Sequence, residues 1–355
     1  MGTVAAAATA VISQLTNARS CPRLLNHLSN KYHYFLLQRS LLFTRNPLCQ
    51  NPSLSAAISV HNRVKLFRRS AFFPAGAKMV VVETKPSSDS SSQEQQQQQQ
   101  HDDFPATELE YFQDMFALQS KATFLALVKE GDRLAVIVDR TILYPQGGGQ
   151  PCDTGYISAV DERVKFRVED VRAKNGIVYH YGNFESSEDT SFQIGQELLL
   201  KVDDSRRSQN SRLHSAGHLL DACMKTIGLV SLEPGKGHHF PDSPFVEYKG
   251  AIPVSDVEKK RAELEGEANR LVLIGGSVQA VIAPYAEAAK LCGGSLPDYI
   301  AKESSPRIVS VGGLGCPCGG THVADVSEIG IIKVTQIRVK KGMTKVSYTI
   351  AAATK

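Results

Sequence analysis

Two histidines in the sequence HSAGH have the spacing of a metal-binding pair. His214 and His218 are four residues apart in a segment whose apolar residues recur at helical spacing. Residues at positions i and i+4 project from one face of a helix, so both imidazoles can reach a single metal ion. The pair by itself is weak evidence, because two histidines at this spacing are at least as often packed or surface residues.

A second group of ligand-type residues follows much later in the chain, in the sequence GCPCGGTHV. Cys318 and His322 flank a Gly-rich stretch, which we expect to form a loop between two strands where side chains converge with little obstruction. A thiolate and three imidazoles form a borderline-soft donor set that suits Zn²⁺. The sequence therefore predicts a zinc site made of His214, His218, Cys318 and His322. Cys316 is a rival thiolate that the spacing does not exclude.

The residues between the helical ligands leave the purpose of this site open. A helical metalloprotease site carries Glu directly after its first His, whereas this chain has Ser215, Ala216 and Gly217 between the two. A site with four protein ligands resembles a closed structural zinc site. A catalytic role requires an open position or a ligand that leaves.

The hydrophobic period changes near Asp203, which indicates two kinds of structure. Before it, short alternating segments broken by turn residues predict a small β-barrel or sandwich. Its expected strands are 123–128, 134–138, 155–160, 164–171, 177–181 and 197–202. After it, the spacing predicts a helix that ends at Gly228 and is capped by Asp204 or Ser205.

A second helix is predicted from a capping box at Ser255 and Glu258 to Gly275. The remaining expected elements are a strand at 278–283, a short helix at 286–291, and strands at 308–311, 329–339 and 345–351. Helices placed among strands without regular βαβ alternation predict an α+β fold.

Composition divides the chain again at its N-terminal end. The chain has a net charge of +4, but residues 1–78 contain no Asp or Glu and ten of the 40 Lys and Arg residues. The remaining residues therefore carry 30 basic and 36 acidic side chains, a net charge of −6. A basic, Ser-containing and acid-free segment predicts an organellar transit peptide over 1–78, in preference to a basic nucleic-acid-binding arm. The uncharged first 18 residues favour a chloroplast, whereas the Arg content favours a mitochondrion.

Residues 79–106 are rich in Ser and Gln and predict a disordered linker. Met79 stands at its start, and we expect it to serve as a second initiation site that gives a cytoplasmic form. The length of 355 residues allows two folded domains after this linker. No window approaches the 18 uninterrupted apolar residues of a membrane helix, so we expect a soluble protein without a membrane partner.

The motifs HSAGHLL, GKGHHF and CGGTHV occur in this order and follow DRTILYPQGGGQPCDTG. Together they resemble the editing domain of alanyl-tRNA synthetase and its free-standing AlaX-type relatives, over about residues 134–351. The resemblance implies an α+β protein in which a small N-terminal β-barrel precedes a two-layer α/β editing domain shared with threonyl-tRNA synthetase. We therefore expect a barrel domain at 107–203 and a zinc-binding editing domain at 204–355, after the disordered N-terminal tail.

The resemblance also implies an activity, which is hydrolysis of the ester that joins serine, and also glycine, to alanine tRNA. It assigns Zn²⁺ to the four ligands named above. It assigns a role in shaping the amino-acid pocket to the loop formed by Gly147, Gly148, Gly149 and Gln150, which without it is an ordinary turn between strands. Zinc would orient the substrate and polarise water or the ester carbonyl, while backbone amides stabilise the oxyanion.

Serine recognition is where this chain departs from the synthetase pattern. Synthetase editing domains commonly carry Thr before the second helical His, whereas this chain has Gly217. The expected replacements for that hydroxyl, and the candidate catalytic side chains, are Thr321, Gln150 and Ser215. His238 and His239 either assist the reaction or are packed and surface residues.

The tRNA partner requires a basic surface in a chain that is acidic after residue 78. Binding depends on local charge, and the expected contacts are Arg206, Arg207, Lys333, Arg338, Lys340 and Lys341. The editing motifs occupy nearly the whole folded part, which leaves no room for an aminoacylation domain, and no ATP is expected. The alternative is a non-catalytic protein that holds zinc and binds tRNA or a synthetase. The oligomeric state is not predicted.

Overall fold

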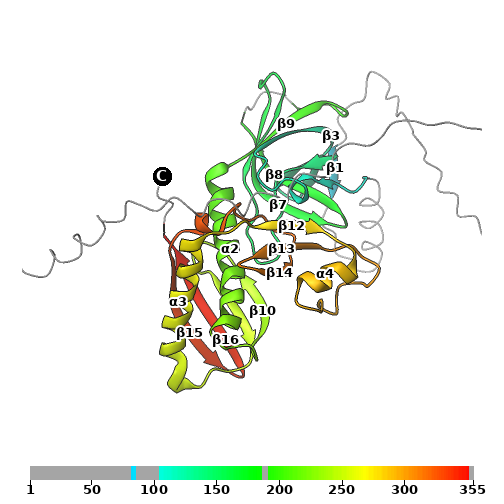
Figure 1. Cartoon of the computed structure of the whole chain (residues 1–355). Coiled ribbons are helices and arrows are strands. Elements are labelled where there is room, and N and C mark those ends of the chain that lie inside the picture. Colours follow the sequence, from blue (N-terminus) through cyan, green and yellow to red (C-terminus); the bar gives the residue numbers. More distant parts are fainter. Residues whose placement is uncertain (1–80, 85–103, 186–190, 352–355) are drawn as a thin grey trace, which may run out of the picture. The chain divides into compact units, whose positions relative to one another are not determined.

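The computed structural model describes residues 81–84, 104–185 and 191–351, all within one compact unit from Ser70 to Lys355. The predicted transit peptide, Met79 and the Gln tract lie outside these residues. None of the described helices is both long and apolar enough to span a membrane. Figure 1 shows a β-rich part followed by a part in which helices accompany strands.

Six strands close into a barrel, in the order β3-β4-β8-β7-β6-β9 with β9 returning to β3. Their bounds are β3 (Gln119–Glu130), β4 (Arg133–Val138), β6 (Gly155–Ala159), β7 (Lys165–Lys174), β8 (Ile177–Phe184) and β9 (Glu197–Val202). Closure depends on the long strand β3. Its first half pairs with β9 up to Thr123 and its second half with β4 from Phe124, and the register with β4 shifts between Phe124 and Ala126.

Alternation along the strands fills the barrel interior. In β9, Leu198, Leu200 and Val202 are buried while Glu197 and Lys201 are exposed. Together with Ile157, Phe166 and Val168 they form the barrel core, and each such side chain stabilises the fold by about 1.5–3 kcal/mol relative to exposure. Two short strands, β2 (Glu108–Leu109) and β5 (Arg140–Thr141), pair with each other.

The linker prediction for 79–106 is wrong at one segment. Strand β1 (Val81–Thr84) pairs in parallel with the second half of β3, whose other edge is occupied by β4. The segment VVET has the β-branched residues that favour a strand. Composition did not indicate this strand, because Ser and Gln dominate the rest of the predicted linker. Residues 104–106 are also described.

The second part contains a four-stranded antiparallel sheet and two long helices. The sheet order is β10 (Glu233–His238), β11 (Phe245–Lys249), β16 (Met343–Ile350) and β15 (Ile332–Lys340). Helices α2 (Asp204–Thr226) and α3 (Val257–Ile274) pack on one face, which gives a layer of helices on a layer of strands. Leu219, Leu264 and Val346 lie in the shared core. The structure thus has the predicted α+β character, with a six-stranded barrel and a mixed α/β region.

A smaller sheet and a short helix complete this part. The sheet order is β12 (Gln279–Ile282), β13 (Arg307–Val311) and β14 (Leu314–Pro317), and α4 (Tyr285–Leu291) packs against it. Sequence periodicity did not predict β10, β11 or β14. In β10 and β14, Gly and Pro residues break the apolar alternation, and pairing with neighbouring strands stabilises them as strands. Strand β11 contains neither residue and does alternate, with Val246 and Tyr248 buried, but it is only five residues long.

Both predicted helix caps are wrong in detail. The α2 cap is Asp203, whose carboxylate accepts a hydrogen bond from the Arg206 amide, rather than Asp204 or Ser205. The capping box of α3 does not form, because Ser255 lies in a preceding 3-10 helix and donates to the Asp256 carboxylate.

Candidate metal centre

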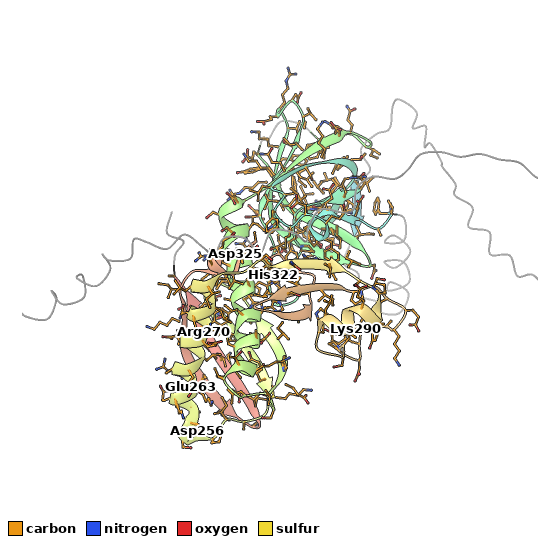
Figure 2. All side chains as sticks on the ribbon, viewed as in Figure 1. Asp256, Glu263, Arg270, Lys290, His322 and Asp325 are labelled. Atoms are coloured by element: carbon orange, nitrogen blue, oxygen red, sulfur yellow. The ribbon has the colours of Figure 1, made fainter. Side chains whose placement is uncertain are left out.

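The four residues predicted as ligands converge on one point. His214 and His218 come from one face of α2, while Cys318 and His322 come from the loop after β14; His322 is labelled in Figure 2. Their ligand atoms all lie within 4.8 Å of one another. The Cys318 Sγ is 3.6 Å from His214 Nε2 and 3.4 Å from His322 Nε2. The rival thiol Cys316 is not part of this group.

Polar partners orient the three imidazoles toward this point. Gln150 Oε1 accepts from His214 Nδ1 at 2.7 Å, and Ser215 Oγ lies 3.2 Å from His322 Nδ1. His218 Nδ1 faces Asp221 Oδ2 at 4.0 Å. The hydrogen bonds at Nδ1 of His214 and His322 leave the Nε2 atoms of these two rings free to point at the centre. His218 Nε2 is buried and has no hydrogen-bond partner among the described residues, as expected for an atom that binds an ion.

Burial sets the protonation of the group. It lowers the pKa of His218 to about 4 and holds the pKa values of His214 and His322 well below the usual histidine value, so all three are neutral near pH 7. Burial raises the pKa of the Cys318 thiol to about 11, while the Gly320 amide and Arg307 favour the thiolate. Neutral imidazoles and one ionisable thiol match the needs of a metal ion, which displaces the thiol proton on binding.

Gln150 connects the barrel to this group. It is fully buried at the end of a tight turn in which Gly148 and Gly149 have positive φ. Its Nε2 donates to Thr321 Oγ1 at 2.8 Å, and its Oε1 accepts from the Thr321 amide at 3.0 Å as well as from His214. The turn is therefore more than a connection between strands, because its last residue fixes both a ligand and the ligand loop.

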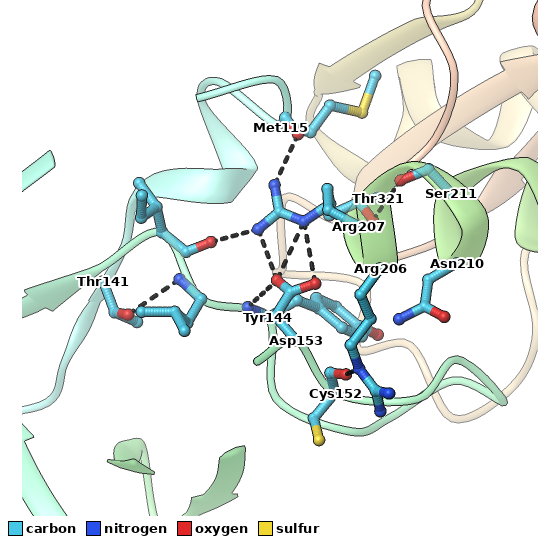
Figure 3. A network of polar contacts seen from close by, with 12 residues as sticks. Met115, Thr141, Tyr144, Cys152, Asp153, Arg206, Arg207, Asn210, Ser211 and Thr321 are labelled. Carbon is cyan, nitrogen blue, oxygen red and sulfur yellow. Dashed lines mark hydrogen bonds and ion pairs between the residues drawn. The ribbon is translucent and has the colours of Figure 1, made fainter. Parts of the chain in front are cut away.

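The other two predicted reactive residues are also engaged. Thr321 Oγ1 contacts Ser211 Oγ at 2.8 Å in addition to Gln150, and Ser215 Oγ accepts from the Val323 amide at 3.2 Å besides facing His322. The Thr321–Ser211 contact is visible in Figure 3. In this arrangement Thr321, Ser215 and Gln150 position the ligands.

Replacing Gln150 by Leu is expected to weaken metal binding by about 10–100-fold, because the variant no longer fixes the His214 ring. Competition with a chromophoric chelator measures the metal affinity. Gln146→Leu is the matched control, since Gln146 is exposed in the same loop. Equal metal affinity in the Gln150 variant and the unchanged chain would show that the hydrogen bond has no such role.

Beside the group lie Arg307, which sequence reasoning missed, and His239, whose role it left open. Arg307 is buried, and its Nη1 donates to the carbonyls of Cys318 and Gly320, which holds the ligand loop. His239 is buried, and its ring stacks on the ring of His214 with centroids 4.6 Å apart. Burial lowers the pKa of His239 to about 3. The repeated His in GKGHHF was a signal for His239, whereas no pattern marked Arg307.

The prediction that Arg207 contacts RNA is wrong. Its guanidinium is buried and forms an ion pair with Asp153 of the barrel, with 2.6 Å between Nη2 and Oδ2 (Figure 3). It also donates to the carbonyls of Met115 and Ile142. Arg206 is half-buried, and its Nε donates to the Cys152 carbonyl. These two side chains attach α2 to the barrel.

The other predicted RNA contacts are exposed. Lys333, Arg338 and Lys340 lie on β15, an edge strand of the four-stranded sheet, and Lys341 is in the turn to β16. Their neighbours Ile332, Val334 and Ile337 point into the core. An open cavity of about 390 Å³ is lined by His322, Met115 and Ser211, and His322 is the one member of the ligand group that borders it.

Comparison with known proteins agrees with this architecture. Residues 76–206 match the family described as class II (A) tRNA synthetases, and residues 307–346 match the second additional domain of threonyl and alanyl tRNA synthetases. The alanyl-tRNA editing protein AlaX-L of Pyrococcus horikoshii is 33% identical over 245 residues, which cover 68% of this chain and 57% of that protein.

Alanine–tRNA ligases show similar identity over a smaller share of their length. The ligase of Methanococcus vannielii is 32% identical over 254 residues, and that of Acaryochloris marina is 30% identical over 235 residues. These matches cover 70% and 65% of this chain but only 26% of each ligase. The two family matches contain the barrel and the strand-rich region around the ligand loop. The chain therefore belongs to the family of alanyl-tRNA synthetase editing domains and AlaX-type editing proteins.

Proposed function

We propose that this protein is a zinc-containing hydrolase that deacylates mischarged alanine tRNA, releasing serine and also glycine. The observation that carries the proposal is the group of His214, His218, Cys318 and His322, which Gln150 connects to the Gly-rich turn. The similarity to an alanyl-tRNA editing protein supports the same activity. Hydrolysis of an ester requires no ATP.

The need for such an enzyme follows from the size of alanine. An alanine-binding pocket cannot strongly exclude the smaller glycine, and a hydrophobic pocket discriminates poorly against a residue that merely adds a hydroxyl. A second site built to bind the hydroxyl separates serine from alanine much better, because alanine leaves the buried polar group of that site unpaired.

The metal, the Gly-rich turn and two backbone amides would have separate roles at the proposed site. A bound zinc ion would supply polarisation of the ester carbonyl or of water. The Gly147–Gln150 turn would line the amino-acid pocket. The amides of Gly148 and Gly149 donate to no protein group in the described part of the chain, and consecutive amides at positive φ can stabilise a developing oxyanion.

The proposed function is tested with the full-length chain and alanine tRNA charged separately with serine, glycine and alanine. We expect rapid release of serine and glycine, no release of alanine, and loss of release when a chelator removes the metal. Zinc bound in stoichiometric amount and tRNA retained, with no amino acid released, would establish the non-catalytic alternative.

We further propose that the exposed cations of β15 bind the tRNA backbone. Changing Lys333, Arg338 and Lys340 together to Gln is expected to weaken tRNA binding and to reduce the slope of log affinity against log salt by roughly one unit per lost phosphate contact. Filter binding over a salt series measures both. Lys290→Gln on α4, an exposed residue labelled in Figure 2, is the control. An unchanged slope would place the contact elsewhere.

The N-terminal 78 residues are proposed to direct the protein to a chloroplast or a mitochondrion, with Met79 starting a cytoplasmic form. Fusing residues 1–78 to a fluorescent protein tests the first proposal. Diffuse fluorescence in the cytosol would contradict it. Sequencing the N-termini of the protein from tissue tests the use of Met79.

A further inference from the structure

His239 lies between the Gly-rich turn and the ligand group. Its backbone amide donates to the Gly149 carbonyl at 2.8 Å. Its side chain is only 4% exposed, and its ring is nearly parallel to that of His214, with 26° between the planes. An amino acid held between the turn and the metal site would thus lie beside this imidazole.

Three glycines from separate segments leave the space that the His239 ring fills. A Cβ atom at Gly217 of α2 would lie 2.4 Å from the His239 Cε1, and one at Gly237 of β10 would lie 2.5 Å from its Nε2. A Cβ atom at Gly149 would lie 3.2 Å from its Cδ2. A side chain at position 217 and the imidazole of residue 239 therefore exclude each other, so no hydroxyl from residue 217 can enter this space.

A buried hydrogen-bond chain fixes the tautomer of His239. The Tyr348 hydroxyl donates to the Leu213 carbonyl at 2.9 Å, so its oxygen is left to accept from His239 Nδ1 at 2.7 Å. With its proton on Nδ1, the ring carries a lone pair on Nε2. Nε2 makes no hydrogen bond to any described residue, unlike the polar atoms of Gln150 and Thr321, which are occupied.

We propose that His239 Nε2 accepts a hydrogen bond from the β-hydroxyl of the seryl group and so makes this site specific for serine. The proposal rests on the deacylase function proposed above. Alanine places a methyl group where the hydroxyl would lie and offers no donor to Nε2, so a bound alanyl group would leave a buried acceptor unpaired. Glycine has no side chain there, which leaves room for a water molecule to donate to Nε2, so its hydrolysis does not depend on His239.

The experiment measures kcat/KM for release of serine and of glycine by the full-length chain and its His239→Ala variant. We expect the seryl value to fall by about 10–100-fold, since an unpaired buried polar group has this order of effect, while the glycyl value changes by less than about threefold and the zinc content stays the same. His238→Ala is the matched control, because the His238 ring stacks on Phe240 and Phe245 outside this space; both substrates should be unaffected.

Tyr348→Phe provides a second test that keeps the imidazole in place. Without the hydroxyl, Nδ1 loses its hydrogen-bond acceptor, and the proton of the neutral ring can move to Nε2. The ring then no longer always offers an acceptor at Nε2, so seryl release should fall several-fold while glycyl release should not change. Equal losses for both substrates, or no loss for either, would overturn the role of His239. A wild-type protein that releases neither amino acid would instead overturn the deacylase function itself.

Discussion

Replacing Cys318 by Ala is expected to abolish stoichiometric metal binding and to lower deacylation by at least about 100-fold. Cys318 is the only sulfur donor in the group, and its Sγ lies within 3.6 Å of two imidazole nitrogens. Its loss leaves three imidazoles, of which His218 has a buried Nε2 with no protein partner in the described structure. Zinc content is measured by atomic emission, and activity by release of serine from alanine tRNA.

Cys316→Ala is the control for this experiment. Cys316 lies two residues away on β14, and its thiol contacts the Pro317 carbonyl rather than the ligand group. We expect this variant to keep its zinc and its activity. Full activity of the Cys318 variant after the metal has been removed would show that the metal has no part in the reaction.

Replacing Arg207 by Ala is expected to lower the free energy of unfolding by about 3–5 kcal/mol, because it leaves the carboxylate of Asp153 buried without its counter-charge. Asp153 is fully buried and Arg207 is 4% exposed, so water does not screen their interaction. The same guanidinium satisfies the carbonyls of Met115 and Ile142. Urea denaturation followed by fluorescence or circular dichroism measures the loss.

Two further variants separate the charge from the packing. Arg206→Ala removes a half-exposed neighbour and should cost about 1 kcal/mol or less, in line with one hydrogen bond. Arg207→Met with Asp153→Leu removes both charges and should recover much of the stability. A loss below about 1 kcal/mol for Arg207→Ala would contradict a structural role of the ion pair.

The convergence of the four candidate metal ligands was predictable, because each signal for them depends on local spacing or on residue type. The i, i+4 spacing of His214 and His218 determines one helix face wherever the helix lies. The residue types of Cys318 and His322 indicate the same kind of ion. What the sequence left open was the choice between Cys316 and Cys318, because only the path of β14 and its loop decides which thiol faces α2.

The barrel was predictable for a similar reason, since alternation with a period of two is a local property of each strand. Strands β10 and β14 were not predictable in this way. Their glycines and prolines weaken the local preference, and hydrogen bonds to neighbouring strands determine their conformation. The cap of α2 was displaced by one residue, because Asp203 and Asp204 have equal capping chemistry.

The sequence by itself determined the ligand types, the helical pair, the fold class and the resemblance to an editing domain, because each depends on residue identity or on short-range spacing. Only the tertiary structure decided which polar residues reach the ligands. Gln150 is 64 residues from His214, and Arg207 is 54 residues from Asp153. Three features arise where the barrel, α2 and the strands meet: the burial of Arg207, the hydrogen bonds of Gln150 and the glycine-lined space around His239. A local sequence pattern cannot predict such contacts, because they join segments that are far apart in the chain.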